Sequence, residues 1–196
     1  MEEFKLFLTL AALIVSILSL YLHFRKPKLK VRYEDKSPYK KLSMVKSDSR
    51  PYPLEIFIRV KVNNSRKKIA KKCFGKITDW YTNGKKVDEF DPIKLHWVSN
   101  DLSDYSPIDL AKDEYEYLDI IKTNREQAKL LIYTNTHPRG TPLSFSDKDE
   151  HLFRLSIYCE NETSTSKWFV LSYTGDRNTG DLTWISMKQS DKKIKD

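Results

Sequence analysis

Apolar residues run almost without interruption through the first part of the chain and then give way abruptly to basic ones. From Phe4 to Phe24 the 21 residues read FKLFLTLAALIVSILSLYLHF, with no Lys, Arg, Asp or Glu between positions 6 and 22. A helix of this length would extend about 31 Å, close to the roughly 30 Å hydrocarbon core of a bilayer. Its few polar residues do not form the polar face of a soluble amphipathic helix. The pattern predicts one transmembrane helix over residues 4–24.

A cleaved signal peptide is the main alternative for this segment. Signal peptides begin with basic residues, have an apolar stretch of about 7–15 residues and end in small residues. Here Glu2 and Glu3 precede a longer run that ends in LYLHFRK, so we expect a retained anchor. The residues that follow it are basic, namely Arg25, Lys26, Lys28, Lys30 and Arg32. Since Lys and Arg near a helix end stay in the cytoplasm, we expect the C-terminal part there; these residues could also bind anionic lipid headgroups.

From residue 54 onward, apolar and polar residues alternate with the period of two that is typical of β-strands. Ile56, Ile58, Val60 and Val62 are the first such set. The Asn83-Gly84 pair predicts a two-residue hairpin, because both residue types accept positive φ. The predicted strands lie at 29–33, 54–62, 73–82, 93–98, 115–121, 128–134, 153–159, 167–173 and 182–187.

Eight or nine short strands, with no more than one helical turn near 123–129, predict an all-β fold. We expect an antiparallel β-sandwich, with a barrel as the alternative, because two inward faces would use the alternating apolar residues. The predicted organisation has four parts. They are the transmembrane helix at 4–24, a basic, Pro-containing juxtamembrane connector at 25–53, the β-sandwich domain at 54–188, and a charged tail at 189–196.

The chain has 196 residues and a formal net charge of +8, but half of this excess belongs to the anchor. Residues 1–32 contain six basic and two acidic groups, which leaves 29 basic against 25 acidic residues in the rest of the chain. Such a mixed surface is not the footprint of a nucleic-acid-binding protein, and we expect no nucleic acid partner. Cys73 and Cys159 could form a disulfide in an oxidising compartment, and would be reduced in the cytoplasm.

No motif in the sequence indicates a catalytic, cofactor-binding or metal-binding site, and we expect no enzymatic activity. We interpret His96, beside Trp97 in a predicted strand and facing the opposite way, as structural or exposed. His137 and His151 flank a loop without a matching carboxylate or cysteine. An acidic loop could offer oxygen ligands to Ca²⁺, although it lacks the spacing of a calcium-binding loop. Its carboxylates are Asp101, Asp104, Asp109, Asp113, Glu114 and Glu116.

A second basic run, RKKIAKK, follows the first long strand. Its charged residues, the candidate partner-binding set, are Arg66, Lys67, Lys68, Lys71 and Lys72. They could bind lipid headgroups, an acidic protein or nucleic acid, or simply keep a turn solvated. Tryptophans at positions 80, 97, 168 and 184 fall in predicted strands, where packing is the default. If several aromatic side chains were exposed on one face, that face would suit protein binding.

The stretch Ile58 to Thr78, IRVKVNNSRKKIAKKCFGKIT, resembles a recurring phrase of β-sandwich proteins. A strand ends in Val-x-Asn, a polar turn and an Ala follow, and a Cys opens the next strand. Immunoglobulin-like, adhesion-type modules of membrane-anchored prokaryotic proteins often read this way, although this chain has Ser65 to Lys68 where their turn usually carries Gly. The resemblance implies an immunoglobulin-like fold and a membrane setting, and it implies no activity or site residues.

The sequence thus leads us to expect a single-pass cell-membrane protein whose β-sandwich domain is a non-enzymatic protein-interaction module. Membrane lipid and an unidentified protein are the expected partners, and no cofactor is expected. The alternatives are a membrane-attached enzyme that uses the loops at 99–114 and 135–150, and a structural subunit that makes its contacts through the helix.

Overall fold

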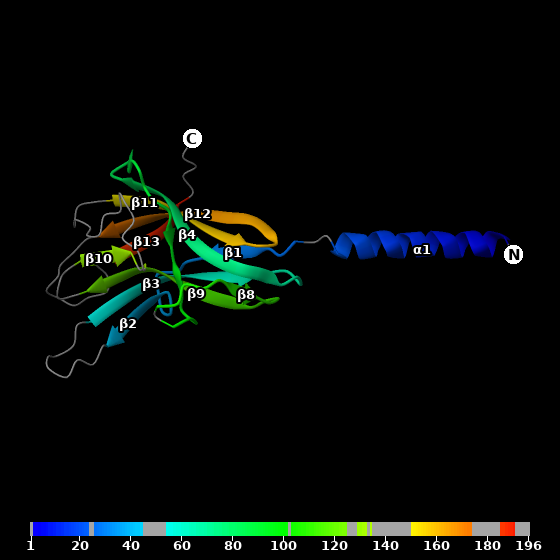
Figure 1. The fold of residues 1–196 in the computed structure, drawn as a ribbon, viewed down its shortest axis with the longest axis horizontal. Coiled ribbons are helices and arrows are strands. Elements are labelled where there is room, and N and C mark those ends of the chain that lie inside the picture. Colours follow the sequence, from blue (N-terminus) through cyan, green and yellow to red (C-terminus); the bar gives the residue numbers. More distant parts are fainter. Residues whose placement is uncertain are drawn as a thin grey trace.

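The computed structural model of the chain describes residues 2–23, 26–44, 54–101, 103–124, 129–132, 134, 150–173 and 185–190. Within these residues one helix, α1 (Glu2–His23), extends away from a body of β-strands (Figure 1). The window Phe4–Tyr21 is not buried against the rest of the protein. By its length and composition, α1 is apolar enough to cross a membrane.

The first sheet is antiparallel and has six strands, with β3 and β9 at its centre. β1 and β2 pair one after the other with one edge of β3, and β7 and β10 pair with β9 in the same way. Its strands are β1 (Leu29–Arg32), β2 (Lys40–Met44), β3 (Leu54–Asn64), β7 (His96–Trp97), β9 (Tyr115–Asn124) and β10 (Lys129–Ile132). The strand predicted at 29–33 is confirmed as β1, whereas β2 was not predicted. Both strands lie in segment 25–53, so this segment contributes two strands to the sheet.

The second sheet is also antiparallel and has seven strands in the order β13-β12-β11-β4, with three short strands along the free edge of β4. Its strands are β4 (Ala70–Thr82), β5 (Lys85–Lys86), β6 (Ile93–Lys94), β8 (Ile108–Leu110), β11 (Glu150–Cys159), β12 (Glu162–Tyr173) and β13 (Ile185–Ser190). The predicted hairpin is confirmed, because Thr82 pairs with Lys85 and both Asn83 and Gly84 have positive φ. The all-β prediction is confirmed by these two sheets.

Segment 93–98, predicted as one strand, is divided between the two sheets. Ile93 pairs with β4 in the seven-stranded sheet, and Trp97 pairs with β9 in the six-stranded sheet. The N–H of Leu95, between them, donates to the carbonyl of Gly75 at 3.0 Å. Ile93, Leu95 and Trp97 are all fully buried. The apolar alternation therefore marked residues that face the core, but the chain between them crosses from one sheet to the other.

The inward faces of the two sheets share one hydrophobic core. Trp80, Phe153 and Phe169 form a stacked row in it, with ring centroids 5.3 and 5.7 Å apart. Gly75 packs tightly against the facing sheet, since a Cβ atom on it would stand 2.6 Å from Cδ1 of Leu118 on β9. Because Gly75 has no side chain, the Leu118 side chain can pack directly against the backbone of β4.

Several other predictions meet the structure only in part. The predicted loop at 99–114 contains the short strand β8, because Leu110 packs into the core beside β4. β13 extends to Ser190, two residues into the predicted tail. Residues 125–128, 135–149, 174–184 and 191–196 lie outside the described residues, and with them His137, Trp184 and most of the second predicted loop.

Candidate functional site

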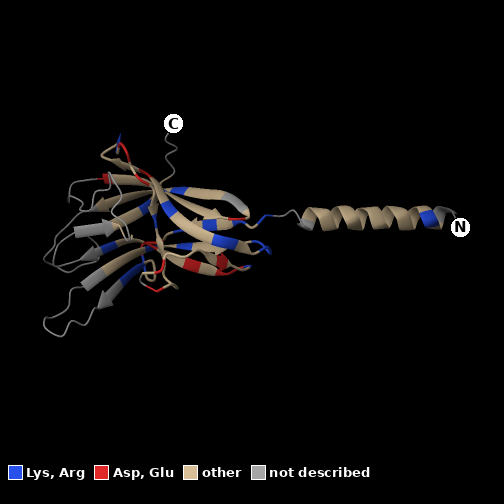
Figure 2. Ribbon diagram, in the orientation of Figure 1, with Lys and Arg blue, Asp and Glu red and all other residues tan. Residues whose placement is uncertain are grey.

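The two basic runs of the sequence lie at the same end of the β domain. The backbone carbonyl of Lys28 accepts hydrogen bonds from the N–H of Ser65 at 2.9 Å and from its hydroxyl at 3.1 Å. The Arg66 guanidinium donates to the carbonyl of Lys26 at 3.4 Å. Figure 2 shows Lys and Arg at the end of the body nearest α1, with Asp and Glu beside them. The turn between β3 and β4 therefore lies beside the start of β1, where the chain enters the domain.

Asn64, the last residue of β3, holds these two segments together. Its side-chain oxygen accepts from the N–H of Lys28 at 3.3 Å and of Arg66 at 3.2 Å. Its amide group donates to the carbonyls of Lys68 at 2.6 Å and Leu110 at 3.1 Å. Asn64 is fully buried, so these bonds satisfy polar groups that water does not reach. The asparagine of the Val-x-Asn pattern thus sets the position of the basic turn.

We call this region the basic end and define it by seven residues, all of which have exposed side chains: Lys26, Lys28, Arg66, Lys67, Lys68, Lys71 and Lys72. Two further predicted basic residues, Lys30 and Arg32, are exposed on β1, and Arg25 lies outside the described residues. Ile69 stands among them with 46% of its surface exposed. Acidic neighbours are present as well: Glu160 lies 3.3 Å from the Lys72 ammonium, in an exposed ion pair.

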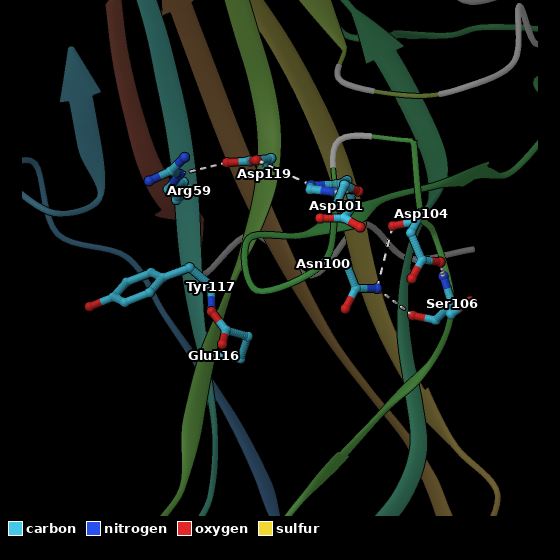
Figure 3. A network of polar contacts seen from close by, with 9 residues as sticks. Arg59, Asn100, Asp101, Asp104, Ser106, Glu116, Tyr117 and Asp119 are labelled. Carbon is cyan, nitrogen blue, oxygen red and sulfur yellow. Dashed lines mark hydrogen bonds and ion pairs between the residues drawn. The ribbon is translucent and has the colours of Figure 1, made fainter. Parts of the chain in front are cut away.

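A buried polar cluster on the outer side of the six-stranded sheet was missed by the sequence analysis (Figure 3). Arg59 on β3 donates to Asp119 on β9 at 2.6 Å, and the two side chains are only 11% and 3% exposed. His96 on β7 faces the same carboxylate, with Nδ1 3.4 Å from Oδ2, and its Nε2 donates to the carbonyl of Asp101 at 2.8 Å. The ring of Tyr105 covers His96 edge-on, with centroids 5.3 Å apart.

This cluster joins strands and does not present a reactive atom to solvent. His96 and Asp119 are 1% and 2% exposed, and both ring nitrogens of His96 are engaged. His96 does face away from the core-facing Trp97, as predicted, but Asp101 and Tyr105 of the following loop cover it. Its environment supports a structural role. In the sequence, Arg59 and Asp119 are only two opposite charges 60 positions apart. The local pattern of residues does not indicate that their strands pair.

Several of the acidic residues that suggested a calcium loop accept hydrogen bonds from backbone N–H groups. The Asp104 carboxylate accepts from the N–H of Ser106 at 2.7 Å, and Asp109 accepts from the N–H of Lys72 at 2.8 Å. Glu114 accepts from the N–H of Ala111 at 2.6 Å. Hydrogen bonds from Ser106 hold the pKa of the Asp104 carboxyl below its usual range. Across the described part of the chain, no three His, Cys, Asp or Glu side chains are grouped to hold a metal ion.

The two cysteines, which the sequence left open as a pair, are neighbours on β4 and β11. Their sulfur atoms are 2.6 Å apart and are free thiols in this structure. The hydrogen bond with Cys159 raises the pKa of the Cys73 thiol, and burial raises it further. Neither the hydrogen bond nor the burial favours a nucleophilic thiolate at Cys73.

Aromatic side chains stand on the outer face of the seven-stranded sheet, on strands whose inward residues form the core. Phe74 and Tyr158 stack with centroids 5.3 Å apart, and Tyr81 meets Trp168 edge-on at 5.9 Å. All four are partly exposed. The Arg154 guanidinium lies 5.7 Å from the centre of the Trp168 ring. We call these five residues the aromatic face. Trp80 and Trp97 are fully buried instead, as core packing predicts.

A second group of aromatic residues crosses the outer face of the six-stranded sheet. Each ring in this row meets the next edge-on, with ring centroids 5.6 to 5.9 Å apart, in the order Tyr33, Tyr39, Tyr117 and Tyr115. Burial raises the pKa of Tyr39 and Tyr117, and burial together with the Asp35 carboxylate raises that of Tyr33. Tyr39 is 6% exposed, so this row is largely packed within the domain; Tyr115 is its one exposed member, and the Lys61 ammonium lies 3.5 Å from the centre of its ring.

Comparison with known proteins does not supply a function. No protein-family model matches the chain, and no curated protein matches it. The features of the chain that bear on its function are α1, the basic end and the aromatic face.

Proposed function

We propose that this is a single-pass membrane protein whose β domain is an immunoglobulin-like sandwich and acts as a non-enzymatic module that binds another protein through the aromatic face. The observation that carries the proposal is the set of partly exposed aromatic rings with Arg154 on one rigid sheet. Tyr, Trp and Arg are the residues enriched at the centres of protein interfaces. Strands, unlike loops, hold them in place before binding, which lowers the entropic cost of association.

The charges around this face indicate what kind of partner would fit. The ammonium groups of Lys76 and Lys94 lie 5.6 and 5.7 Å from the centre of the Phe74 ring. Asp79 is engaged by Arg154 at 2.6 Å, so it offers little negative charge to a partner. A partner surface with apolar side chains bordered by carboxylates would complement this face.

The alternative of a membrane-attached enzyme has less support. The His96–Asp119 pair is closed to solvent, and the Asp104 and Glu114 carboxylates accept hydrogen bonds from backbone N–H groups. A second alternative is a structural subunit that contacts its partner through α1. Exchanging α1 for a foreign transmembrane helix distinguishes this alternative from the proposed binding module. Partner binding that survives this exchange supports the β domain as the binding module, whereas binding lost with an intact domain favours the helix.

Substitutions test the aromatic face directly. Trp168→Ala with Tyr158→Ala removes two of its rings, and Tyr115→Ala removes an exposed tyrosine of the other sheet as a matched control. Proteins cross-linked to each variant in the membrane would be quantified by mass spectrometry. We expect the double variant to lose a specific partner by at least tenfold and the control to retain it. An unchanged set of cross-linked proteins in all three samples would refute the proposed interface.

We further propose that the β domain lies in the cytoplasm, on the basis of the basic residues after α1. Protease protection tests this side of the proposal. In cells whose outer barrier is permeable but whose membrane is intact, the domain should resist added protease and be cut only after lysis. Cleavage in intact cells would reverse the proposed orientation.

A further inference from the structure

We propose that the basic end, together with Ile69, rests on the anionic headgroups of the leaflet from which α1 emerges, and so fixes the tilt of the β domain on the membrane. This inference rests on the proposed membrane attachment. It goes beyond membrane attachment, because a domain tethered by a helix can remain attached without touching the lipid surface itself.

Chain length places the basic end near the bilayer whatever the angle of the helix. α1 ends at His23, and Lys26 already belongs to the described domain. Three residue steps reach at most about 11 Å. The backbone of Lys26 and Lys28 is bound to Arg66 and Ser65, so the β3–β4 turn cannot move away from this entry point without breaking those bonds. The turn is therefore held close to the membrane interface.

The chemistry of the turn matches a lipid surface. Arg66, Lys67, Lys68 and Lys71 present long, exposed cationic side chains around Ile69. Such side chains bind phosphate headgroups while their apolar stems and a neighbouring aliphatic residue enter the interface. Asn161 holds Ile69 in this position: its amide donates to the carbonyl of Ile69 at 2.8 Å, and its oxygen accepts from the N–H of Lys71 at 3.0 Å.

The chain offers an internal control at the other end of the domain, a second pair of adjacent lysines that matches Lys67 and Lys68. Lys85 and Lys86 are exposed beside the Asn83-Gly84 hairpin, which follows the last residue of β4. β4 has 13 residues and begins at the basic end. At about 3.3 Å per residue, the hairpin lies about 40 Å from the basic turn along the strand, several Debye lengths from any headgroup the turn touches.

The test measures lysine acetylation of the full-length protein in lipid nanodiscs made of phosphatidylcholine alone or with 30% phosphatidylglycerol. We expect the acetylation rate of Lys67, Lys68 and Lys71 to fall at least threefold in the anionic discs and to recover in about 0.5 M NaCl, because salt screens headgroup charge. The rates of Lys85 and Lys86 should not change. Equal rates at Lys71 in the two lipids, or a fall that includes Lys85, would overturn the proposal.

Two charge-matched variants complete the test. With K67E and K68E together, Lys71 should react in anionic discs as fast as in neutral ones, whereas K85E with K86E should leave the protection of Lys71 intact. If both variants behave alike, the turn does not bind the lipid. A chain that fails to stay with discs of either composition would instead refute the anchor, and this proposal with it. Protection of the turn by an added acidic protein and not by lipid would assign the basic end to a protein partner.

Discussion

Replacing Asp119 by Asn removes the carboxylate from a place where the Arg59 guanidinium has little access to water. The two side chains are 11% and 3% exposed and their atoms are 2.6 Å apart, and His96 contacts the same carboxylate. Removal of one partner from a buried ion pair typically costs about 3–5 kcal/mol, because the remaining charge is left desolvated. Domains of this size are stable by about 0.05–0.15 kcal/mol per residue, so Asp119→Asn should remove a large fraction of the total.

Urea unfolding of the detergent-solubilised full chain, followed by tryptophan fluorescence, measures this loss, since Trp80 and Trp97 are fully buried in the core. The matched control is Glu160→Gln, which breaks the exposed pair with Lys72 and should cost less than about 1 kcal/mol. Arg59→Met combined with Asp119→Leu removes both charges and should recover most of the stability lost in the single variant. A loss below about 1 kcal/mol in Asp119→Asn, equal to that of the control, would show that the Arg59 guanidinium is not left desolvated and would refute the reasoning.

Four further outcomes are expected. Oxidation of Cys73 and Cys159, 86 positions apart, should raise the free energy of unfolding of the purified protein by about 4–5 kcal/mol. In whole cells denatured without reductant, both thiols should nevertheless react with maleimide, because the proposed cytoplasmic location would keep them reduced. Thiols that do not react would contradict the proposed cytoplasmic orientation of the β domain. Gly75→Ala should cost about 1–3 kcal/mol in urea unfolding, because its Cβ would collide with Leu118 in the packed core. Finally, the pKa of Tyr39 is raised above the ordinary 10.0, so its neutral form stabilises the fold below about pH 10 and this contribution is lost as the pH rises further. Tyr39→Phe should therefore unfold less readily than the wild type in alkaline titrations monitored by circular dichroism, and an identical profile would refute that role.

Local sequence was sufficient for the elements whose cause is local. The uninterrupted apolar run determines α1, and the period of two in Ile56, Ile58, Val60 and Val62 determines which face of β3 is buried. The Asn83-Gly84 turn follows from backbone conformations that these two residue types adopt at low cost. Each of these features depends on residues within a few positions of one another.

Other features depended on which strands became neighbours. The segment at 93–98 has the alternation of a single strand, and its division between two sheets follows only from the positions of β4 and β9. β2 lacks a clear apolar alternation and exists because β3 offers it an edge.

The candidate sites show the same division. Sequence alone identified the two basic runs as charged and exposed, since each run is contiguous. Their meeting at one end of the domain, through Asn64 and Lys28 at a separation of 36 residues, was decided by the pairing of β1 with β3. The Arg59–Asp119 pair and the adjacent thiols, 60 and 86 positions apart, were decided likewise. Hydrophobic periodicity reports whether a side chain faces the core, but it carries no information on which distant strand lies beside it, and that is settled by packing of the whole domain.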